Sequence, residues 1–202
     1  ISKKIYVPNK NIIKETESYI IENNEDFIVI NKKAGLPVQG GTKVKENVIN
    51  ILTNSIYFQN TKPFIVHRID KDTSGALLIA KNRSTAQQLT SLFRIRSVHK
   101  TYLAVTFGNM DKKKDILDNN LIRYEGNKKI LERAITHYQK IDTNNYYTLF
   151  KLKPITGRKH QIRKQLLNIG HPIVGDKKYN LDLYKKSNNK NLMLHSYKIK
   201  FM

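Results

Sequence analysis

Cysteine is absent from this chain of 202 residues, which excludes disulfide bonds, thiolate zinc sites and cysteine nucleophiles. Long apolar runs are also absent, since none approaches the roughly 20 residues that a membrane-spanning helix needs. Acidic residues are scarce: 16 of them stand against 37 lysines and arginines, and the net charge is +21. A charge of this size and sign indicates a polyanionic partner, for which nucleic acid is the first candidate.

Length and hydrophobic patterning predict one globular domain with a buried core. Hydrophobic residues make up 39% of the chain, and strand-like segments outnumber helical ones. The segments expected to form strands are 18–22, 27–31, 76–80, 100–108, 134–139, 146–152 and 193–201. We therefore expect an α+β fold with a mixed, largely antiparallel central sheet flanked by helices and loops.

Helices are expected where apolar residues recur every three or four positions. One such segment is 47–55, and another begins at Thr85 with Ser84 as its N-cap. A third carries Ile162, Leu166 and Ile169 and ends at a glycine. The polar stretch between the expected strands, 109–129, is predicted to form loops with room for a short hairpin.

The densest polar motif is the segment 67–75, of sequence HRIDKDTSG. The apolar run 76–80 follows it directly and is typical of a buried central strand. A polar loop anchored on such a strand holds a reactive side chain with little positional freedom, and Asp70 is the candidate nucleophile. The same residue types also form ordinary turns, in which side chains bond to nearby backbone.

Two further motifs carry candidate functional residues. Lys100 and Tyr102 belong to an expected strand, where an aromatic residue is usually part of the core. The segment 156–163, TGRKHQIR, is typical of a basic helix start that suits a phosphate group, and the segment 170–179, GHPIVGDKKY, follows it.

Together these motifs resemble the signatures of the RluA/RluC/RluD family of pseudouridine synthases, over a stretch from about residue 18 to the last residue. The matching strings are HRIDxxTSG before an apolar strand, KxY, GRxHQIR and GHPIxGDxxY. The resemblance implies the pseudouridine synthase fold and the isomerisation of specific uridines in RNA. Large-subunit (23S) ribosomal RNA is the expected substrate, with transfer RNA as the alternative, and the reaction needs neither a cofactor nor a metal.

The resemblance also implies roles for individual residues. Asp70 takes the place of the nucleophilic aspartate, Tyr102 that of the tyrosine that stacks on the flipped uracil, and Arg163 that of the arginine that pairs with the aspartate. Arg68 takes the place of the arginine that enters the RNA helix where the uridine has left. Whether the aspartate attacks the base or the sugar stays open. The further residues expected to contact the substrate are Thr73, Lys100, Arg158, His160 and Ile162.

The chain departs from the family pattern at a few positions. Ile69 stands in place of leucine, which conserves volume. In the glycine-rich segment 32–41, Lys33 and Gln39 replace a proline and a histidine, so no role of that histidine is carried over. Gln165 stands where histidine is common, away from the inferred chemistry.

The resemblance also sets the expected domain boundaries and partners. Residues 1–15 are expected to be a basic lead-in, resembling the tail of the S4-type RNA-binding domain that precedes the catalytic domain in RluC-like proteins. The catalytic domain is expected to span 16–202. The protein is expected to act as a cytoplasmic monomer that binds RNA and no membrane.

Two other functions fit parts of the sequence. A catalytically silent RNA-binding module could keep the same fold, although loss of Asp70, Tyr102 or Arg163 would then be expected. A metal-dependent nuclease or phosphatase could use Asp70 with Asp72, but such sites need several converging carboxylates and acidic residues are few. The histidines also show no helical pair with a nearby acidic ligand, so no metal site is predicted.

Overall fold

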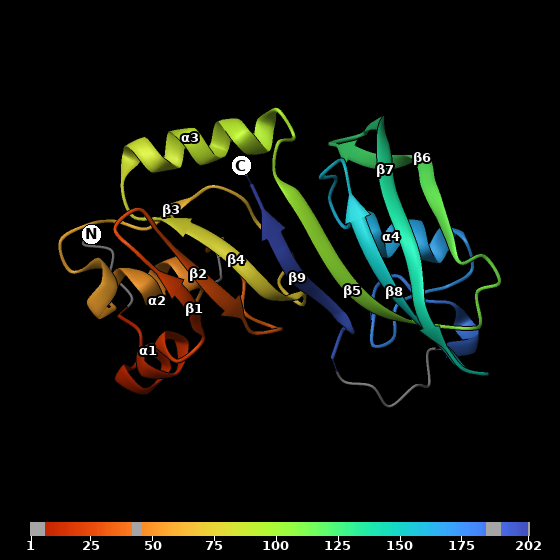
Figure 1. Cartoon of the computed structure of the whole chain (residues 1–202), viewed down its shortest axis with the longest axis horizontal. Coiled ribbons are helices and arrows are strands. Elements are labelled where there is room, and N and C mark those ends of the chain that lie inside the picture. The colour runs from red at the N-terminus through yellow and green to blue at the C-terminus, as the bar shows by residue number, and fades with distance from the viewer. Residues whose placement is uncertain (1–6, 42–45, 185–190, 202) are drawn as a thin grey trace. The chain divides into compact units, whose positions relative to one another are not determined.

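The computed structural model describes residues 7–41, 46–184 and 191–201. The chain divides into two compact units, Ile1–Ser97 and Val98–Met202, whose elements are labelled in Figure 1. Both units are built from antiparallel strands and a few helices, which confirms the expected α+β fold. None of the described helices is long and apolar enough to cross a membrane.

The first unit is a small antiparallel sheet with helices around it. Strands β1, β2 and β4 are neighbours in that order, and the short β3 pairs with the end of β4. Strand β4 is buried along almost its whole length, as expected for the apolar run that follows the polar motif. The elements are α1 (Lys10–Glu17), β1 (Ile20–Asn23), β2 (Phe27–Lys32), α2 (Val48–Thr53), the 3-10 turn η1 (Ile56–Phe58), β3 (Phe64–Ile65), β4 (Ser74–Ala80) and α3 (Arg83–Arg94).

Two local features of the first unit differ from the sequence-based expectation. A helix, α1, begins at Lys10 within the expected lead-in, and the side chain of Asn9 caps it by accepting a hydrogen bond from the backbone N–H of Asn11. Helix α3 is capped by Asn82, whose side chain accepts a hydrogen bond from the backbone N–H of Thr85 at 2.8 Å. The assignment of the cap to Ser84 was therefore wrong, because the helix begins earlier.

The second unit is a five-stranded antiparallel sheet in the order β9-β5-β8-β7-β6. Helix α4 packs on one face, where its apolar residues join those of the strands in a single core cluster. In Figure 1 this helix lies behind the sheet. The elements are β5 (His99–Phe107), β6 (Lys114–Glu125), β7 (Lys128–Thr143), β8 (Tyr147–Pro154), α4 (Gln161–Asn168), the 3-10 turn η2 (Asp182–Tyr184) and β9 (Leu194–Lys200).

The expectation of loops over 109–129 was wrong, because this stretch contains the twelve-residue strand β6. Strand β6 pairs with β7 in continuous register, from Lys114 opposite Gln139 to Glu125 opposite Lys128. Its buried residues, Leu117 and Leu121, lie on the same face of the strand, but the inward position between them is the polar Asn119, so the apolar alternation typical of a strand is interrupted. Cross-strand pairing, which local sequence does not reveal, holds this strand in place.

Candidate active site

Asp70 lies in a tight loop directly before β4. Its backbone carbonyl accepts a hydrogen bond from the N–H of Thr73, and Thr73 itself is only 2% exposed. Ile69 is buried in the core, whereas Arg68 is exposed and Asp70 is half-buried. Gly75 has a φ of +106°, a conformation that side-chain-bearing residues rarely adopt. The loop therefore anchors its apolar residues in the core and leaves Asp70 half-buried.

A buried lysine supports this loop from within. Lys32, at the end of β2, is 1% exposed, and its ammonium group donates to the carbonyls of Lys33 and Leu36 at 2.7 Å and of Lys71 at 2.9 Å. Burial lowers the pKa of Lys32 to about 8, although the charges of Asp72 and Asp70 oppose the shift. The amine thus links two loops, one of which continues directly from Asp70.

Sequence reasoning missed the role of Lys32, although a signal was present. The side chains of β2 alternate between the two faces, and Lys32 falls on the same face as the buried Ile28 and Ile30. A lysine at an inward position needs partners for its ammonium group. Backbone carbonyls of two loops supply them here.

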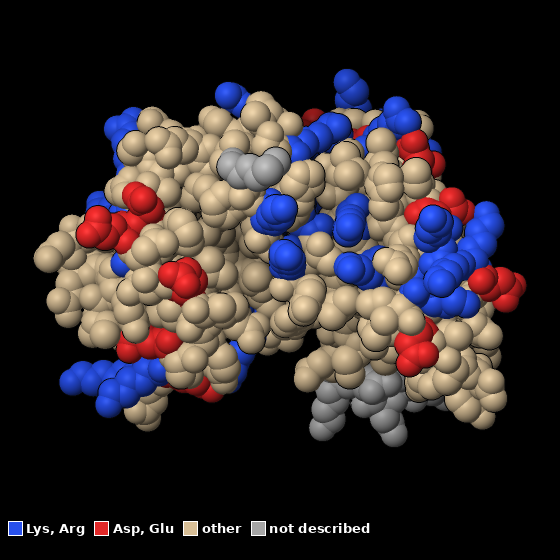
Figure 2. All heavy atoms as spheres, viewed as in Figure 1, with Lys and Arg blue, Asp and Glu red and all other residues tan. Residues whose placement is uncertain are grey.

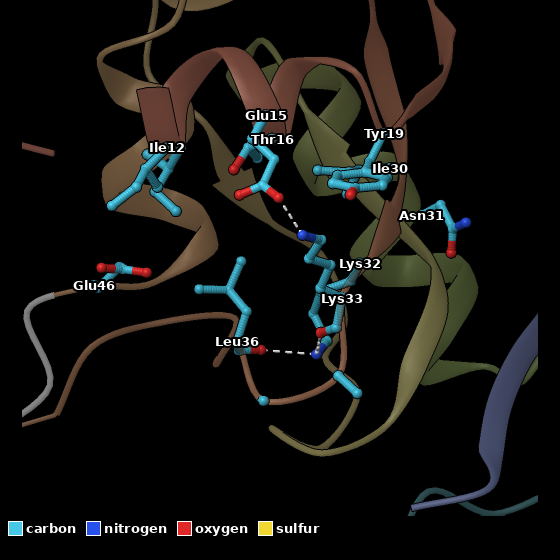
Figure 3. A pocket seen from close by; sticks show the side chains of 13 residues that line it. Ile12, Glu15, Thr16, Tyr19, Ile30, Asn31, Lys32, Lys33, Leu36 and Glu46 are labelled. Atoms are coloured by element: carbon cyan, nitrogen blue, oxygen red, sulfur yellow. Dashed lines mark hydrogen bonds and ion pairs between the residues drawn. The ribbon is translucent and has the colours of Figure 1, made fainter. Parts of the chain in front are cut away.

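A small pocket is lined by Lys32 and by the loop that follows it. Its volume is about 200 Å3, and helix α1 forms one wall. Figure 3 shows Lys33 reaching across it to Glu15, with which it forms an ion pair, while the Lys33 ammonium group also lies 4.9 Å from the centre of the Tyr19 ring. Leu36, whose carbonyl accepts from Lys32, also lines this pocket. Helix α1 therefore packs against the segment that supports the Asp70 loop.

His67, the first residue of the polar motif, has a structural role. Its Nε2 accepts a hydrogen bond from the backbone N–H of Leu78 at 2.9 Å, and its ring stacks on Phe93 with centroids 4.6 Å apart. The imidazole therefore joins the start of the motif to β4 and to helix α3. No chemistry was predicted for His67, and its contacts give it a packing function.

Tyr102 lies on the face of the second sheet that α4 covers. It is half-buried and packs against the core cluster of that face. Lys100, two residues earlier on β5, points to the same side, and its ammonium nitrogen lies near Gly157, 3.9 Å from the position that a β-carbon would take there. The strand thus brings the KxY motif next to the segment that precedes α4.

Arg163 forms a buried, bidentate ion pair with Asp176. Its side chain is 6% exposed and that of Asp176 is fully buried, and the two hydrogen bonds measure 2.6 and 2.7 Å. The carboxylate also accepts from the backbone N–H groups of Lys178 and Tyr179. Burial alone would raise the pKa of Asp176, but these hydrogen bonds and the Arg163 charge hold it below its usual value.

Sequence reasoning assigned Arg163 to Asp70 and did not foresee Asp176. The two partners are 13 residues apart and are separated by the end of α4 and a loop, so no local spacing rule links them. Asp176 does stand in the GHPIxGDxxY string, but nothing in that string indicates its partner. Pairing between Arg163 and Asp70, which belong to different units, stays a prediction.

Residues at the start of α4 form a connected group. The guanidinium of Arg163 lies 5.0 Å from the centre of the Tyr179 ring, and the Tyr179 hydroxyl is 2.9 Å from Nδ1 of His160. His160 has a φ of +54°, which is uncommon for a residue with a side chain. Arg158 is held to β7 by the carbonyl of Arg133 and the carboxylate of Glu132.

The structure distributes the predicted site residues over both units. The first unit carries Arg68, Asp70 and Thr73, all within one loop. The second unit carries the remaining ones, which its strands and α4 bring to one side of the sheet. Of these, Ile162 is buried in the core, where it packs against the strands. Within the described residues, no group of three or more histidine or acidic side chains could hold a metal ion.

Comparison with known proteins yields consistent matches. A family model described as RNA pseudouridylate synthase matches residues 26–168, a span that contains Asp70, Tyr102 and Arg163. A ribosomal large subunit pseudouridine synthase C of Rickettsia bellii is 40% identical over 179 residues, which cover 84% of this chain and 59% of that protein. The Vibrio vulnificus protein of the same name is 34% identical over 203 residues, 95% of this chain and 63% of that protein.

Solved structures show the same similarity in three dimensions. Human RNA pseudouridylate synthase domain containing 4 superimposes with a TM-score of 0.78 at 27% identity, covering 95% of this chain and 87% of that one. Human RNA pseudouridylate synthase domain containing 1 gives a TM-score of 0.76 at 24% identity. This similarity shows a shared fold and nothing more. The chain spans about 60% of the length of the curated relatives that it matches.

Proposed function

The chain belongs to the RNA pseudouridylate synthase family, and from this premise we propose that it converts uridine to pseudouridine in RNA. Large-subunit ribosomal RNA is the proposed substrate, which the names of the Rickettsia and Vibrio relatives support. The observation that carries the proposal is the half-buried carboxylate of Asp70, presented by a loop fixed on the buried strand β4. The proposed setting is the cytoplasm, and the proposed active form is the monomer.

The proposed reaction is an isomerisation in which atoms and electrons balance within the substrate. The bond from uracil N1 to the ribose breaks, and a new bond joins the ribose to C5. C5 loses a proton and N1 gains one, so neither an oxidant nor a cofactor is needed. Asp70 acts as the nucleophile that holds one fragment while the base turns, and attack on the base and attack on the sugar both satisfy this balance.

The other site residues have supporting roles in this proposal. The ring of Tyr102 stacks on the flipped uracil, and its hydroxyl is the proposed group that assists removal of the C5 proton. Arg163, oriented by Asp176, is the proposed ion-pair partner of the Asp70 carboxylate. Exposed Arg68 takes the position that the uridine leaves. The remaining proposed substrate contacts are Thr73, Lys100, Arg158, His160 and Ile162.

The test is pseudouridine formation by a matched pair of variants. Asp70→Asn conserves volume and removes the nucleophilic charge, so we expect loss of activity with an unchanged melting temperature. Asp72→Asn, two residues away on the same loop and exposed, is expected to retain most of the activity. Carbodiimide primer extension on in vitro transcribed ribosomal RNA detects the product. A rate for Asp70→Asn within about tenfold of the wild-type rate, which corresponds to about 1.4 kcal/mol in the activation barrier, would contradict the assignment of Asp70 as the nucleophile.

A further inference from the structure

Lysines occupy adjacent positions on the open face of the sheet in the second unit. Side chains alternate between the two faces of a strand, so residues that alternate with the core residues of this sheet point away from α4. The register places Lys114 of β6 opposite Gln139 of β7, and Gln139 opposite Lys151 of β8. Both lysines therefore lie on one row across three strands, on the side away from the core.

A second row lies next to the first and also carries a lysine. It runs from Ile116 through His137 to Lys153, which stand opposite one another on β6, β7 and β8. All three side chains are exposed. Lys198 of β9 is also exposed and stands opposite Thr101, which alternates with Tyr102 and so lies on this same face. We call Lys114, Lys151, Lys153 and Lys198 the lysine face.

Acidic side chains do not neutralise these rows. Neither row contains an aspartate or a glutamate. The acidic residue of the next row, Asp118, already accepts hydrogen bonds from Nε and Nη2 of Arg133, at 2.9 and 2.6 Å. Figure 2 shows this side of the molecule, with Lys and Arg side chains gathered over β5 and β8 and no acidic side chain among them. The positive charge of the lysine face therefore reaches solvent.

We propose that the lysine face is a second RNA-binding surface, which holds the phosphate backbone on the side of the sheet opposite to Tyr102. The choice of RNA as the polyanion rests on the proposed function. Flexible lysines on a regular, open sheet suit a row of phosphates, because each ammonium acts as a point charge that needs no fixed geometry. Tyr102 and α4 lie on the covered face, so the RNA held here is a different segment from the one that carries the reacting uridine.

The surface is tested by the salt dependence of RNA binding. Lys151→Gln/Lys153→Gln removes two charges from the lysine face, and Lys112→Gln/Lys128→Gln is the matched control. Both control lysines are exposed in the same unit, and Lys112 is paired with Asp115 outside the face. The dissociation constant of a fluorescein-labelled stem-loop RNA with a uridine loop is measured for the 202-residue chain over a range of KCl concentrations. We expect the slope of log K against log salt to fall by about one for each lysine removed from the face.

The outcomes of this experiment test the lysine face independently of the proposed catalytic function. If the Lys151→Gln/Lys153→Gln variant has the same slope of log K against log salt as wild type, the lysine face does not bind RNA. The proposal is also overturned if the slope falls by the same amount in the control variant. Vesicles of phosphatidylglycerol form a parallel arm, and loss of vesicle binding with an unchanged RNA slope would assign the face to a membrane instead. Binding does not require turnover, so a wild-type chain that forms no pseudouridine refutes the proposed function and leaves this measurement intact.

Discussion

The ion pair between Arg163 and Asp176 is the most constrained contact among the site residues. Both side chains are buried, the contact is bidentate, and two backbone N–H groups complete the bonding of the carboxylate. A guanidinium held in this way has one orientation, which is what a residue that directs another carboxylate requires. Removal of Asp176 therefore affects both the stability of the unit and the proposed chemistry.

We expect Asp176→Asn to lower the free energy of unfolding by about 3 kcal/mol, because it leaves a buried guanidinium without its counter-charge. The folded pKa of Asp176 is depressed, so its contribution is complete above the pKa of the unfolded chain, about 3.9, and is lost as pH falls through the folded value. Urea unfolding of wild type and variant between pH 7 and pH 3 measures this. The free energies of unfolding of wild type and variant should become more similar as the pH falls toward 3.

Asp118→Asn is the matched control for this measurement. Asp118 also makes a bidentate contact with an arginine, Arg133, but the pair is exposed to solvent. We expect only a small change in stability, since water screens exposed pairs. If both variants lost the same stability, burial would not be what makes the Arg163 pair important.

Individual residues of the site differ in how far sequence could predict them. Asp70 was placed correctly before a buried strand because a polar loop and an apolar run are local features of the sequence. The bond from Lys32 to the carbonyl of Lys71 spans 39 residues, and the contact of Arg163 with Asp176 depends on the path of a loop. Such contacts arise only when distant segments meet in the fold. The contacts that support the site therefore escaped prediction, whereas the roles assigned to Asp70, Tyr102 and Arg163 stay predictions.

At the scale of elements, helix α3 illustrates how one cap fixes a boundary. The Asn82 side chain accepts from the N–H of Thr85, and its amide also donates to Asp26 on the turn between β1 and β2. We expect Asn82→Ala to cost about 1 kcal/mol of stability, because one helical N–H loses its acceptor. Ser84→Ala, inside the first turn and exposed, should change stability by less than about 0.5 kcal/mol. Thermal melts followed by circular dichroism compare the two, and a larger loss from Ser84→Ala would restore that residue as the cap.

The elements that sequence missed share a physical cause. Helix α1 is largely polar and buries only Thr16, so its apolar pattern is weak. Its place is set by contacts outside the helix, such as the ion pair of Glu15 with Lys33 and the bond from the N–H of Ile56 to Glu17. Strand β6 likewise depends on its partner β7. By contrast, β4 and α4 were predicted because each carries its own hydrophobic pattern.

At the scale of the whole molecule, the chain matches about 60% of the length of its curated relatives. We propose that residues of those relatives beyond the matched stretch add phosphate contacts and help choose among uridines. We therefore expect the 202-residue chain to modify ribosomal RNA more slowly or less selectively than the complete Rickettsia bellii protein. Site-resolved mapping of pseudouridine for both proteins at the same ionic strength makes the comparison, because binding to RNA depends steeply on salt. Identical rates and site choice would place all targeting within the matched stretch.

The buried amine of Lys32 also has a kinetic consequence. An acylating reagent modifies a lysine only when it can reach the amine nitrogen. The burial of Lys32 and its three carbonyl partners keep the reagent away while the loops stay closed. Acylation of Lys32 then proceeds only during local opening of the loops that it joins. The rate at which Lys32 is acylated would thus report how often the loop that carries Asp70 opens.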